Sequence, residues 1–580
     1  MPEPMQEEEE KKKPEVDDAI HGAWSRMWSS VSPQSPLLAW MDWASHLAVS
    51  PGKSAALSSL AFEQMARMHA LARSAVNPQS DKIDLPPPSD RRFVDPTWRQ
   101  WPFNLFSQSF EMQSQWWMEA TSDVWGVDPH HRDIVGFGAK QWMEMCSPTN
   151  LAALNPLVIR KSVDEQGANL ARGLSNFFDD VARRISNQPP AGAENFIVGK
   201  DVAITPGKVI FKNRLIELIQ YEPTTETVHP EPVLIVPAWI MKYYILDLSP
   251  HNSLVRYLVD QGFTVFCISW KNPDADDRDM GMDEYLELGF HAALDVVNTN
   301  TGSNKVHAAG YCLGGTLLSI AVAAMARDQD DRLASLTLLA AQTDFSEPGE
   351  LGLLIDESQI ALLEAQMAEA GYLHAEQMTA AFQMIRSYEL FWSRIVNEYL
   401  LGERKPMNDL MAWNADGTRL PARMHSQYLR RLYLRNDLAA GRYEVAGRSV
   451  SLKDIRLPIF SVGTTTDHVA PWRSVFKLRR LTSAPFTFVL TSGGHNAGIV
   501  SEPGHPRRHY QLMSHAVEDA QIAPDEWLNI APRQDGSWWP EWVSWLRELS
   551  QDRREASIVG VRSNSSLPLQ DAPGEYVTLP

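Results

Sequence analysis

The spacing of hydrophobic residues divides the chain near residue 197. Before this point, apolar residues recur three or four positions apart, the spacing that places them on one face of an α-helix. Examples are the stretches 55–71, 106–124 and 164–185. A linker that contains two prolines, 187–193, closes this part of the chain. The pattern therefore predicts an α-rich N-terminal region.

Beyond residue 197, short apolar runs alternate with helical segments. The runs that we predict as strands are 232–237, 263–270, 305–309, 333–341, 458–466 and 486–490. Because they are apolar at most positions and helices separate them, they are typical of parallel strands that are covered on both faces. Right-handed crossovers between such strands give a doubly wound, mostly parallel α/β domain. The stretch 345–450 interrupts the alternation with helical spacing, which predicts a helical cap inserted between two late strands.

These patterns divide the chain into four consecutive parts. Residues 1–18 contain a run of glutamates and then a run of lysines, and we predict a disordered charged tail. The α-rich region follows at 19–196, and the α/β domain covers 197–548 with the cap insertion at about 345–450. Residues 549–580 are polar and contain proline, so we expect an extended C-terminal tail.

The composition narrows the class of function. With 53 basic and 72 acidic residues, the 580-residue chain has a net charge of −19, which argues against a nucleic-acid partner because phosphate binding needs a basic surface. The three cysteines, Cys146, Cys267 and Cys312, form no CxxC pair, and no HExxH motif occurs, so we expect neither a disulfide framework nor a metal. We find no signal-peptide pattern and no run of about 18 apolar residues, so we expect a cytoplasmic protein without a transmembrane segment.

One of the cysteines lies in a motif that carries chemistry. Cys312 belongs to GYCLGG (310–315), which the predicted strand 305–309 precedes and the helical stretch 313–327 follows. A strand, a tight glycine turn and a helix form a nucleophile elbow, in which the nucleophile projects from the carboxyl edge of the sheet. The helix N-terminus favours a thiolate, and the N–H of Leu313 is placed to bind an oxyanion. The alternative is an inert buried cysteine between two packing glycines.

A nucleophile in this setting needs a histidine and, earlier in the chain, an acid. His495 follows the last predicted strand within GGHNAG, where small neighbours leave room for the ring, and Asp467 follows the strand before it. Asp344 and Asp454 are the alternative acids. We expect His495 to act as the base and Asp467 to orient its imidazole.

The choice of cysteine rather than serine bears on the reaction. A thiolate attacks thioesters readily, and the acyl thioester that forms on the enzyme lies close in energy to an acyl-CoA. This chemistry favours acyl transfer over simple ester hydrolysis.

Several motifs, spaced along the chain, give it a family resemblance. They are DRRFVDPTW (90–98), SPTNLAALNP (147–156), the stretch 242–273, GYCLGGT (310–316), TDHVAPW (466–472), GGHNAG (493–498) and GSWWPEW (536–542). On these residues the chain resembles the polyhydroxyalkanoate synthases over roughly 85–548, especially the long single-subunit type that polymerises short 3-hydroxyacyl-CoA. The resemblance implies an α/β-hydrolase core with a mobile cap over the cysteine. It also implies Cys312, His495 and Asp467 as the triad, and a second oxyanion N–H after the first parallel strand, for which Ile240 is the candidate.

The resemblance implies a reaction and partners as well. The expected substrates are (R)-3-hydroxyacyl-CoA, specifically 3-hydroxybutyryl-CoA, and the growing polyester chain; CoA is a product, and no cofactor is needed. Family members act as homodimers on the surface of polymer granules in the cytoplasm, where granule-coating proteins are further candidate partners. Two alternatives stay open: a cysteine-type hydrolase or intracellular polyester depolymerase, with water as the acceptor, and a non-catalytic granule-associated paralogue.

The chain departs from the family pattern at a few positions near the expected site. Met241 stands where the family usually has asparagine. In the cap, a common tryptophan is absent from RMHSQYLRRLYL (423–434), where the chain has Met424. Asn496 follows His495 at a position where an aliphatic residue is common. The departures leave the three predicted catalytic residues in place and bear on substrate preference and dimer contacts.

Overall fold

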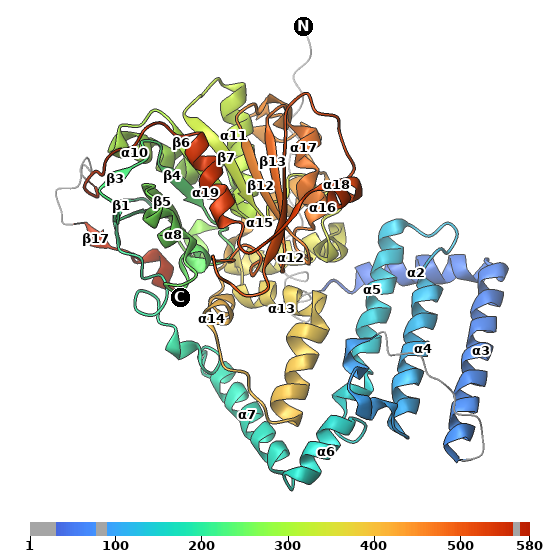
Figure 1. Cartoon of the computed structure of the whole chain (residues 1–580). Coiled ribbons are helices and arrows are strands. Elements are labelled where there is room, and N and C mark those ends of the chain that lie inside the picture. Colours follow the sequence, from blue (N-terminus) through green and yellow to red (C-terminus); the bar gives the residue numbers. More distant parts are fainter. Residues whose placement is uncertain (1–30, 77–89, 561–568) are drawn as a thin grey trace.

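The computed structural model of the chain describes residues 31–76, 90–560 and 569–580. Figure 1 shows two main bodies side by side, a block of long N-terminal helices and a larger α/β domain. The predicted charged tail, 1–18, lies outside the described residues. Across the described ranges, no helix is both long enough and apolar enough to cross a membrane.

Helices make up the N-terminal part, as the apolar spacing predicts. They are α2 (Gln34–Ala48), α3 (Pro51–Val76), α4 (Phe103–Thr121), α5 (Pro129–Met145), α6 (Pro156–Asp164) and α7 (Ala168–Ile185). Helices α5 and α6 each begin with proline after a capping side chain, because Asp128 and Asn155 accept N–H groups of the first turn. A small apolar cluster joins α2 to α5, and in it Trp43 Nε1 donates to the Ala120 carbonyl at 2.9 Å.

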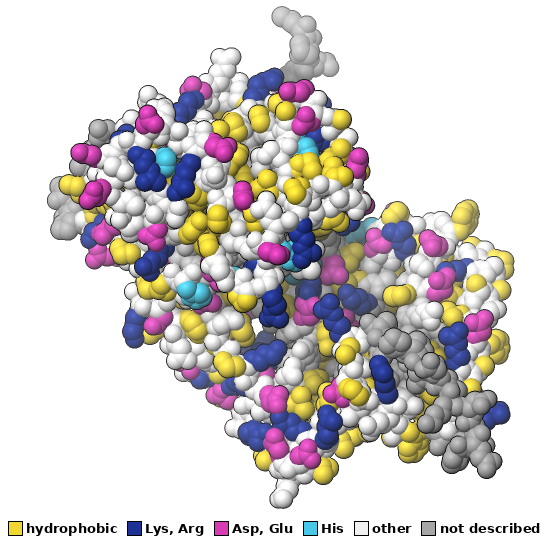
Figure 2. Space-filling view, viewed as in Figure 1, with side chains coloured by type: hydrophobic (Ala, Val, Ile, Leu, Met, Phe, Trp, Pro, Cys, Tyr) yellow, Lys and Arg dark blue, Asp and Glu magenta, His cyan; other side chains and the backbone are white. Residues whose placement is uncertain are grey.

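The N-terminal helices keep many large apolar side chains at their surface. Trp40, Phe62, Trp101, Trp125 and Phe178 are all exposed. Figure 2 shows hydrophobic atoms among charged groups over the visible face of this block. The N-terminal helices therefore bury only part of their apolar surface against one another.

Helix α7 connects the N-terminal part with the cap. Gly173 on α7 packs against the Tyr399 carbonyl of the π-helix η10 (Ile395–Leu400), so closely that a Cβ at this glycine would lie 1.8 Å from the oxygen. Arg404 adds an ion pair with Asp180 at 2.7 Å. These two segments, far apart in the sequence, therefore form one packed pair below the α/β domain in Figure 1.

Eleven strands of the described residues form one sheet, in the order β15-β14-β13-β12-β7-β6-β4-β5-β2-β1-β17. Its centre is parallel and consists of β13 (Phe486–Thr491), β12 (Ile459–Thr464), β7 (Leu333–Leu339), β6 (Val306–Tyr311), β4 (Val233–Val236) and β5 (Val265–Trp270). Every position of β4, β5, β6, β12 and β13 is buried, as expected for strands with helices on both faces. The predicted α/β fold with a parallel core is confirmed.

Helices connect the parallel strands and cover both faces of the sheet. They include α8 (Leu254–Asp260), α10 (Ala292–Thr301), α11 (Leu313–Arg327), α16 (Trp472–Phe476) and α19 (Trp539–Glu548). Trp538, Trp539 and Trp542 are almost completely buried and Trp545 is partly buried. Trp542 Nε1 donates to Thr337 Oγ1 of β7 at 2.9 Å. The tryptophan-rich segment therefore packs against the sheet.

The sequence pattern does not predict the antiparallel strands at the two edges of the sheet. These are β1 (Gly207–Lys212), β2 (Ile216–Tyr221), β14 (His509–His515) and β15 (Arg533–Asp535). Strand β2 is buried, but Glu217 and Gln220 interrupt its apolar run. Strand β14 is only partly buried and β15 is exposed, so neither needs an apolar run.

Residues 549–580 are predicted to form an extended tail, and parts of the described stretches, 549–560 and 569–580, pack onto the α/β domain. Strand β17 (Gln570–Asp571) pairs with β1 at the edge of the sheet. Further on, the Leu579 carbonyl accepts a hydrogen bond from Lys242 Nζ at 2.7 Å. The C-terminal residues therefore brace the loop that follows β4.

The insertion between β7 and β12 forms the cap, and it is mainly helical. Its elements include α12 (Glu357–Ala370), α13 (Ala375–Ile385), α14 (Asp409–Ala415), α15 (Ala422–Tyr428) and the π-helix η11 (Leu429–Leu434). Figure 1 shows these helices gathered at one end of the sheet. Two pairs of two-residue strands also occur within it.

Candidate active site

Cys312 lies in a tight turn between strand and helix. Strand β6 ends at Tyr311 and α11 begins at Leu313, so Cys312 alone makes the connection. Its backbone has a φ of 52° and a ψ of −124°, a conformation that costs energy for a residue with a side chain. This is the geometry of a nucleophile elbow, which directs the side chain away from the sheet edge.

The glycines of the GYCLGG motif allow this turn to pack closely. A Cβ at Gly310 would lie 2.4 Å from the Gly315 Cα. A Cβ at Gly314 would lie 2.1 Å from the Val236 carbonyl oxygen of β4. Other residues could fit only if the backbone moved, so the glycines have the packing role that the sequence predicts.

Two further predicted residues meet at Cys312. Asp467 follows β12 and His495 follows β13, and because these strands are parallel neighbours both residues lie at the same edge of the sheet. His495 Nδ1 lies 2.7 Å from Asp467 Oδ2, and the imidazole also hydrogen-bonds the Cys312 side chain. Since Nδ1 faces Asp467, Nε2 is the nitrogen left for the sulfur. The structure thus brings Cys312, His495 and Asp467 together in a chain of contacts.

Asp467 is held firmly from several sides. Its carboxylate accepts the N–H groups of Val469 and Ala470 at 2.9 Å and 2.8 Å, and the Thr464 hydroxyl at 3.0 Å. Its side chain is 0% exposed. The carboxylate therefore offers His495 a fixed partner.

Burial and charge set the protonation of the pair. Burial alone would lower the pKa of His495, but the charges of Asp467 and Cys312, and hydrogen bonds to both, outweigh burial and raise the pKa well above its usual value. Burial would raise the pKa of Asp467, but the charge of His495 and the hydrogen bonds to the carboxylate lower it overall. Both directions favour an imidazolium at His495 that faces a carboxylate at Asp467.

Neither alternative acid contacts His495 within the described residues. Asp344 accepts the Ser346 N–H at 2.9 Å and the Asn436 side-chain amide at 3.0 Å, so it ties the end of β7 to the cap. Asp454 is exposed at the end of a short 3-10 helix. The geometry favours Asp467 as the partner of His495.

Leu313 and Ile240 line the space beside the Cys312 side chain. Among the described residues, neither backbone N–H group has a hydrogen-bond partner. Two such groups near the sulfur could bind the oxygen of an attacked carbonyl as it becomes negative. Their role as an oxyanion hole stays a prediction.

Cys312 contributes to the walls of two cavities. The larger has a volume of about 350 Å³ and contains His495, Tyr311 and Asn496 in its wall, with Trp413 of the cap opposite. The smaller, of about 90 Å³, has mostly apolar walls from both the α/β domain and the cap. Throughout the described part of the chain, no group of three or more His, Cys, Asp or Glu side chains could hold a metal ion.

The loop after β4 connects the sheet edge to the cap. Thr418 Oγ1 donates to the Trp239 carbonyl at 2.7 Å, and both residues are buried. Met241 forms an antiparallel bridge with Gly417 through its backbone. Because the bridge is made by the main chain, it does not depend on an asparagine at this position.

The other two departures from the family pattern have different surroundings. Met424 is completely buried in α15. Asn496 accepts a hydrogen bond from the Tyr311 hydroxyl at 2.6 Å and donates to Asn414 of the cap at 3.3 Å. Asn496 therefore joins the residue before Cys312 to the cap.

The sequence pattern does not predict which cap residues face Cys312. His425, Tyr428 and Tyr433 line the smaller cavity, and the Tyr428 hydroxyl donates to the Tyr433 hydroxyl at 3.2 Å. All three belong to the stretch 423–434. Its helical spacing indicates a buried face, but only the packed structure shows that this face meets the cysteine.

The fold and the turn at Cys312 define the class of protein. The described chain has the α/β-hydrolase fold, with the strand–turn–helix elbow that carries Cys312 after β6 in the parallel core. A family model of the alpha/beta hydrolase fold matches residues 231–502.

Similar sequences then specify the family. Models of the N-terminus of poly-beta-hydroxybutyrate polymerase match residues 89–258 and 11–53. A poly(3-hydroxyalkanoate) polymerase of Methylorubrum extorquens is 42% identical over 505 residues, which cover 86% of this chain and 82% of the relative. The poly(3-hydroxyalkanoate) polymerase subunit PhaC of Cupriavidus necator is 33% identical over 572 residues, which cover 97% and 95%. The chain belongs to the poly(3-hydroxyalkanoate) polymerase family and is an acyltransferase, and the predicted resemblance is confirmed.

Proposed function

We propose that the protein polymerises (R)-3-hydroxyacyl-CoA, with 3-hydroxybutyryl-CoA as the expected substrate, into a polyester with release of CoA. In this proposal Cys312 is the nucleophile, His495 is the acid and base, and Asp467 orients the imidazole. The observation that carries the proposal is the contact of Cys312, on its strained elbow, with the buried His495–Asp467 pair. Membership of the polymerase family supports the reaction class.

The first step loads the enzyme with an acyl group. The Cys312 thiolate attacks the thioester carbonyl, a bond forms between that carbon and Sγ, and the bond to the CoA sulfur breaks. His495 gives its Nε2 proton to the departing CoA sulfur. The unpaired N–H groups of Leu313 and Ile240 would stabilise the transient oxyanion.

The second step lengthens the chain. Neutral His495 takes the proton of the 3-hydroxyl group of a second acyl-CoA, and the hydroxyl oxygen attacks the acyl carbonyl on Cys312. An ester bond forms, the bond to Sγ breaks, and the thiolate and imidazolium are restored. Attack of Cys312 on the new thioester then transfers the longer chain back to the enzyme and releases CoA.

We extend the proposal to the setting of the reaction. The protein would act as a homodimer on the surface of polymer granules in the cytoplasm. Exposed apolar side chains on the N-terminal helices, such as Trp40, Phe62 and Trp142, support contact with an apolar surface or a granule-coating protein.

The test uses the purified full chain with (R)-3-hydroxybutyryl-CoA. Free-thiol release and the molecular mass of the product are measured for the wild type, for Cys312→Ala and for Cys146→Ala as a matched control. Cys146 is exposed at the end of α5, away from the cavities, so its loss should leave the rate unchanged. We expect high-mass polyester from the wild type and the control, and a loss of at least roughly 10³-fold in Cys312→Ala.

The other outcomes identify the alternatives. Thiol release that yields only free hydroxyacid would make water the acceptor and the protein a hydrolase. A folded wild type that releases no thiol would be a non-catalytic paralogue. Equal rates in Cys312→Ala and the wild type would remove Cys312 as the nucleophile.

A further inference from the structure

The smaller cavity at Cys312 has mostly apolar walls. The α/β domain contributes Ile240 and Leu313, and the cap contributes side chains such as Phe345, Leu351 and Leu429. Its volume of about 90 Å³ is well above the roughly 10–15 Å³ of probe-occupied space that one water needs. The cavity is therefore large enough to hold more than a single water beside the sulfur.

His425 is an unusual member of this apolar wall. It lies on α15, and its side chain is buried, with the residue only 3% exposed. Neither ring nitrogen has a hydrogen-bond partner among the described residues, and Nδ1 is fully shielded by protein. A buried polar nitrogen without a partner is costly, and Nε2, the ring nitrogen that protein does not fully shield, can meet a ligand in the cavity that His425 lines.

The surroundings of His425 determine which kind of contact it can make. Burial lowers the pKa of His425 to about 4, so the imidazole is neutral at physiological pH. A neutral imidazole offers one N–H donor and one acceptor nitrogen, which suits an uncharged oxygen such as a hydroxyl or ester. The nearest aromatic neighbour is Tyr428, whose ring centroid lies 6.2 Å away and whose hydroxyl is already bonded to Tyr433.

The two cavities also divide the space around Cys312. The larger cavity contains His495, the base that must reach the leaving CoA sulfur and the incoming hydroxyl. The smaller cavity contains no part of the His495–Asp467 pair. An acyl chain on Cys312 that extended into the larger cavity would occupy the space that the second acyl-CoA needs.

We propose that the smaller cavity holds the acyl unit attached to Cys312 and that His425 recognises the oxygen on the third carbon of that unit by a hydrogen bond. The proposal rests on the acyl-enzyme chemistry of the proposed function and names the group that selects 3-oxygenated acyl chains. The apolar walls accept the alkyl part of the chain. His425 is then a specificity-determining residue that plays no part in proton transfer at the reacting carbonyl.

The test compares two substrates that differ only in this oxygen. The purified full chain, in excess over thioester, reacts with (R)-3-hydroxybutyryl-CoA or with butyryl-CoA, and the rate of the first CoA release is measured for each. Both substrates can acylate Cys312, so the ratio of the two rates reports recognition of the 3-oxygen separately from catalysis. We expect His425→Leu to lower the ratio of the 3-hydroxybutyryl-CoA rate to the butyryl-CoA rate by about tenfold, as the loss of one hydrogen bond implies. We expect His425→Gln, which keeps a neutral donor and acceptor, to restore most of it.

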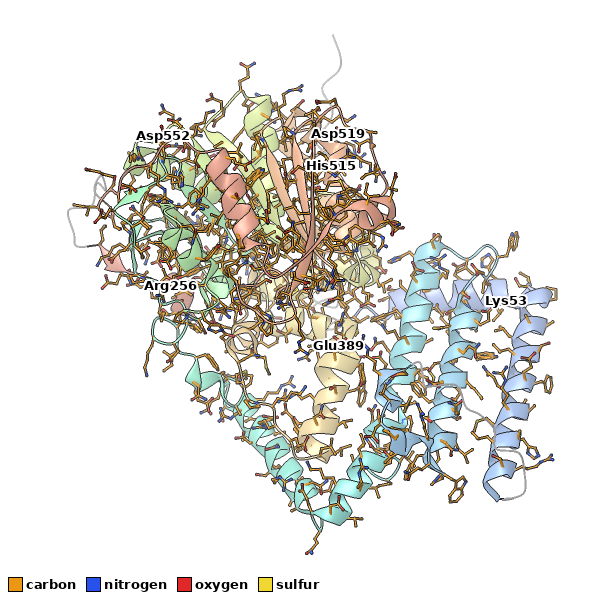
Figure 3. The ribbon with its side chains drawn as sticks, viewed as in Figure 1. Lys53, Arg256, Glu389, His515, Asp519 and Asp552 are labelled. Atoms are coloured by element: carbon orange, nitrogen blue, oxygen red, sulfur yellow. The ribbon has the colours of Figure 1, made fainter. Side chains whose placement is uncertain are left out.

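A matched control is available at His515. This histidine is also buried, and its Nε2 also lacks a partner among the described residues. It pairs with Phe486 at the start of β13, the opposite end of that strand from His495, and Figure 3 shows it far from Glu389 of the cap. We expect His515→Leu to leave the substrate ratio unchanged.

Each outcome bears on one proposal. A ratio that is unchanged in His425→Leu, while Cys312 is still acylated, would overturn the proposal and leave His425 as a residue that holds only a water. An equal fall in the rates with both substrates would show a structural role and would also overturn it. If His425→Leu does not fold, His425→Phe provides the same loss of hydrogen bonding with more of the volume kept. Absence of CoA release by the wild type from either substrate would contradict the proposed function instead.

Discussion

The two walls of the active site are built in different ways. On the sheet side, Cys312, Asp467 and His495 each follow a strand whose every residue is buried. On the cap side, short α-helices and π-helices carry partly exposed residues, and single side-chain hydrogen bonds such as Thr418 to Trp239 connect them to the sheet edge. Under the proposed function, bond making lies on rigid strand ends, while an insertion that packs less tightly encloses the substrate.

The difference separates two tasks within one site. A nucleophile and its base must keep their geometry to a fraction of an ångström, and parallel strands with paired backbones provide such fixed positions. A cap that admits and releases a long chain needs contacts that can open. Substitutions on the sheet side of the site should therefore lower activity more than substitutions on the cap side.

The largest effect is expected at the sheet edge, for Asp467→Asn. The charge of Asp467 helps to raise the pKa of His495, so the neutral amide should lower that pKa and reduce the fraction of imidazolium at neutral pH. The amide can also hold the wrong imidazole tautomer. We expect CoA release to fall by roughly 10²–10⁴-fold.

The pH dependence of Cys312 alkylation by iodoacetamide provides the measurement. In the wild type, the raised pKa of His495 keeps an imidazolium beside the sulfur over more of the pH range, so the pH dependence of alkylation should follow the titration of His495. In Asp467→Asn, the rise in reactivity should move to higher pH, because less imidazolium is present to stabilise the anion. Identical profiles for the two proteins would show that Asp467 does not control the charge of His495. The sheet side would then not show the larger effect that we expect of it.

The sheet wall could be predicted largely from the sequence. Continuous apolar runs indicate buried parallel strands, and their carboxyl ends meet at one edge, so the residues after them are neighbours in space. This argument places Cys312, Asp467 and His495 at one edge of the sheet, and the glycine motif and the chain order of acid and histidine favour them over Asp344, which also follows a predicted strand. The antiparallel strand β2 is not predicted because Glu217, a buried carboxylate, breaks the apolar pattern while it accepts the N–H groups of Glu575 and Tyr576 at 2.9 Å each.

The cap wall could not be predicted to the same depth. Helical spacing shows that residues such as His425 and Tyr428 share a buried face, but it does not show which surface covers that face. The contacts depend on the packing of short helices far apart in the sequence, for instance α12 on α15. The C-terminal residues present the same difficulty, because their position beside Lys242 follows from a long-range contact and leaves no periodic signal.

An intermediate effect is expected where the two walls meet, for Thr418→Val. The change removes the 2.7 Å hydrogen bond to the Trp239 carbonyl and leaves that buried oxygen without its partner, at a cost of about 1–3 kcal/mol. Trp239 directly precedes Ile240, so the loop that carries a predicted oxyanion N–H should become less well fixed. We expect kcat for CoA release to fall by roughly 3- to 10-fold, with little change in the amount of folded protein.

Thr301→Val is the matched control for this prediction. Thr301 Oγ1 donates to the Val297 carbonyl at 2.8 Å near the end of α10, and α10 leads into the start of β6, away from Cys312. Its loss should leave kcat unchanged. If Thr301→Val lowers kcat as much as Thr418→Val does, the effect is one of general stability. The hydrogen bond from Thr418 to Trp239 would then have no particular role in catalysis.

The smallest effect is expected for Asn414→Ala, which removes the cap's hydrogen bond to Asn496. At 3.3 Å and exposed to solvent, this bond exchanges readily with water and should contribute well under about 1 kcal/mol. Because the Tyr311 hydroxyl keeps its own 2.6 Å bond to Asn496, the turn at Cys312 is left intact. We therefore expect CoA release to change by less than about twofold, measured alongside Asn496→Ala, which removes both bonds and should cost more. A fall of more than about tenfold in Asn414→Ala would mean that this contact holds the cap in the position that catalysis needs. The cap would then have to be positioned as precisely as the strand ends, and the two walls of the active site would not differ as we expect.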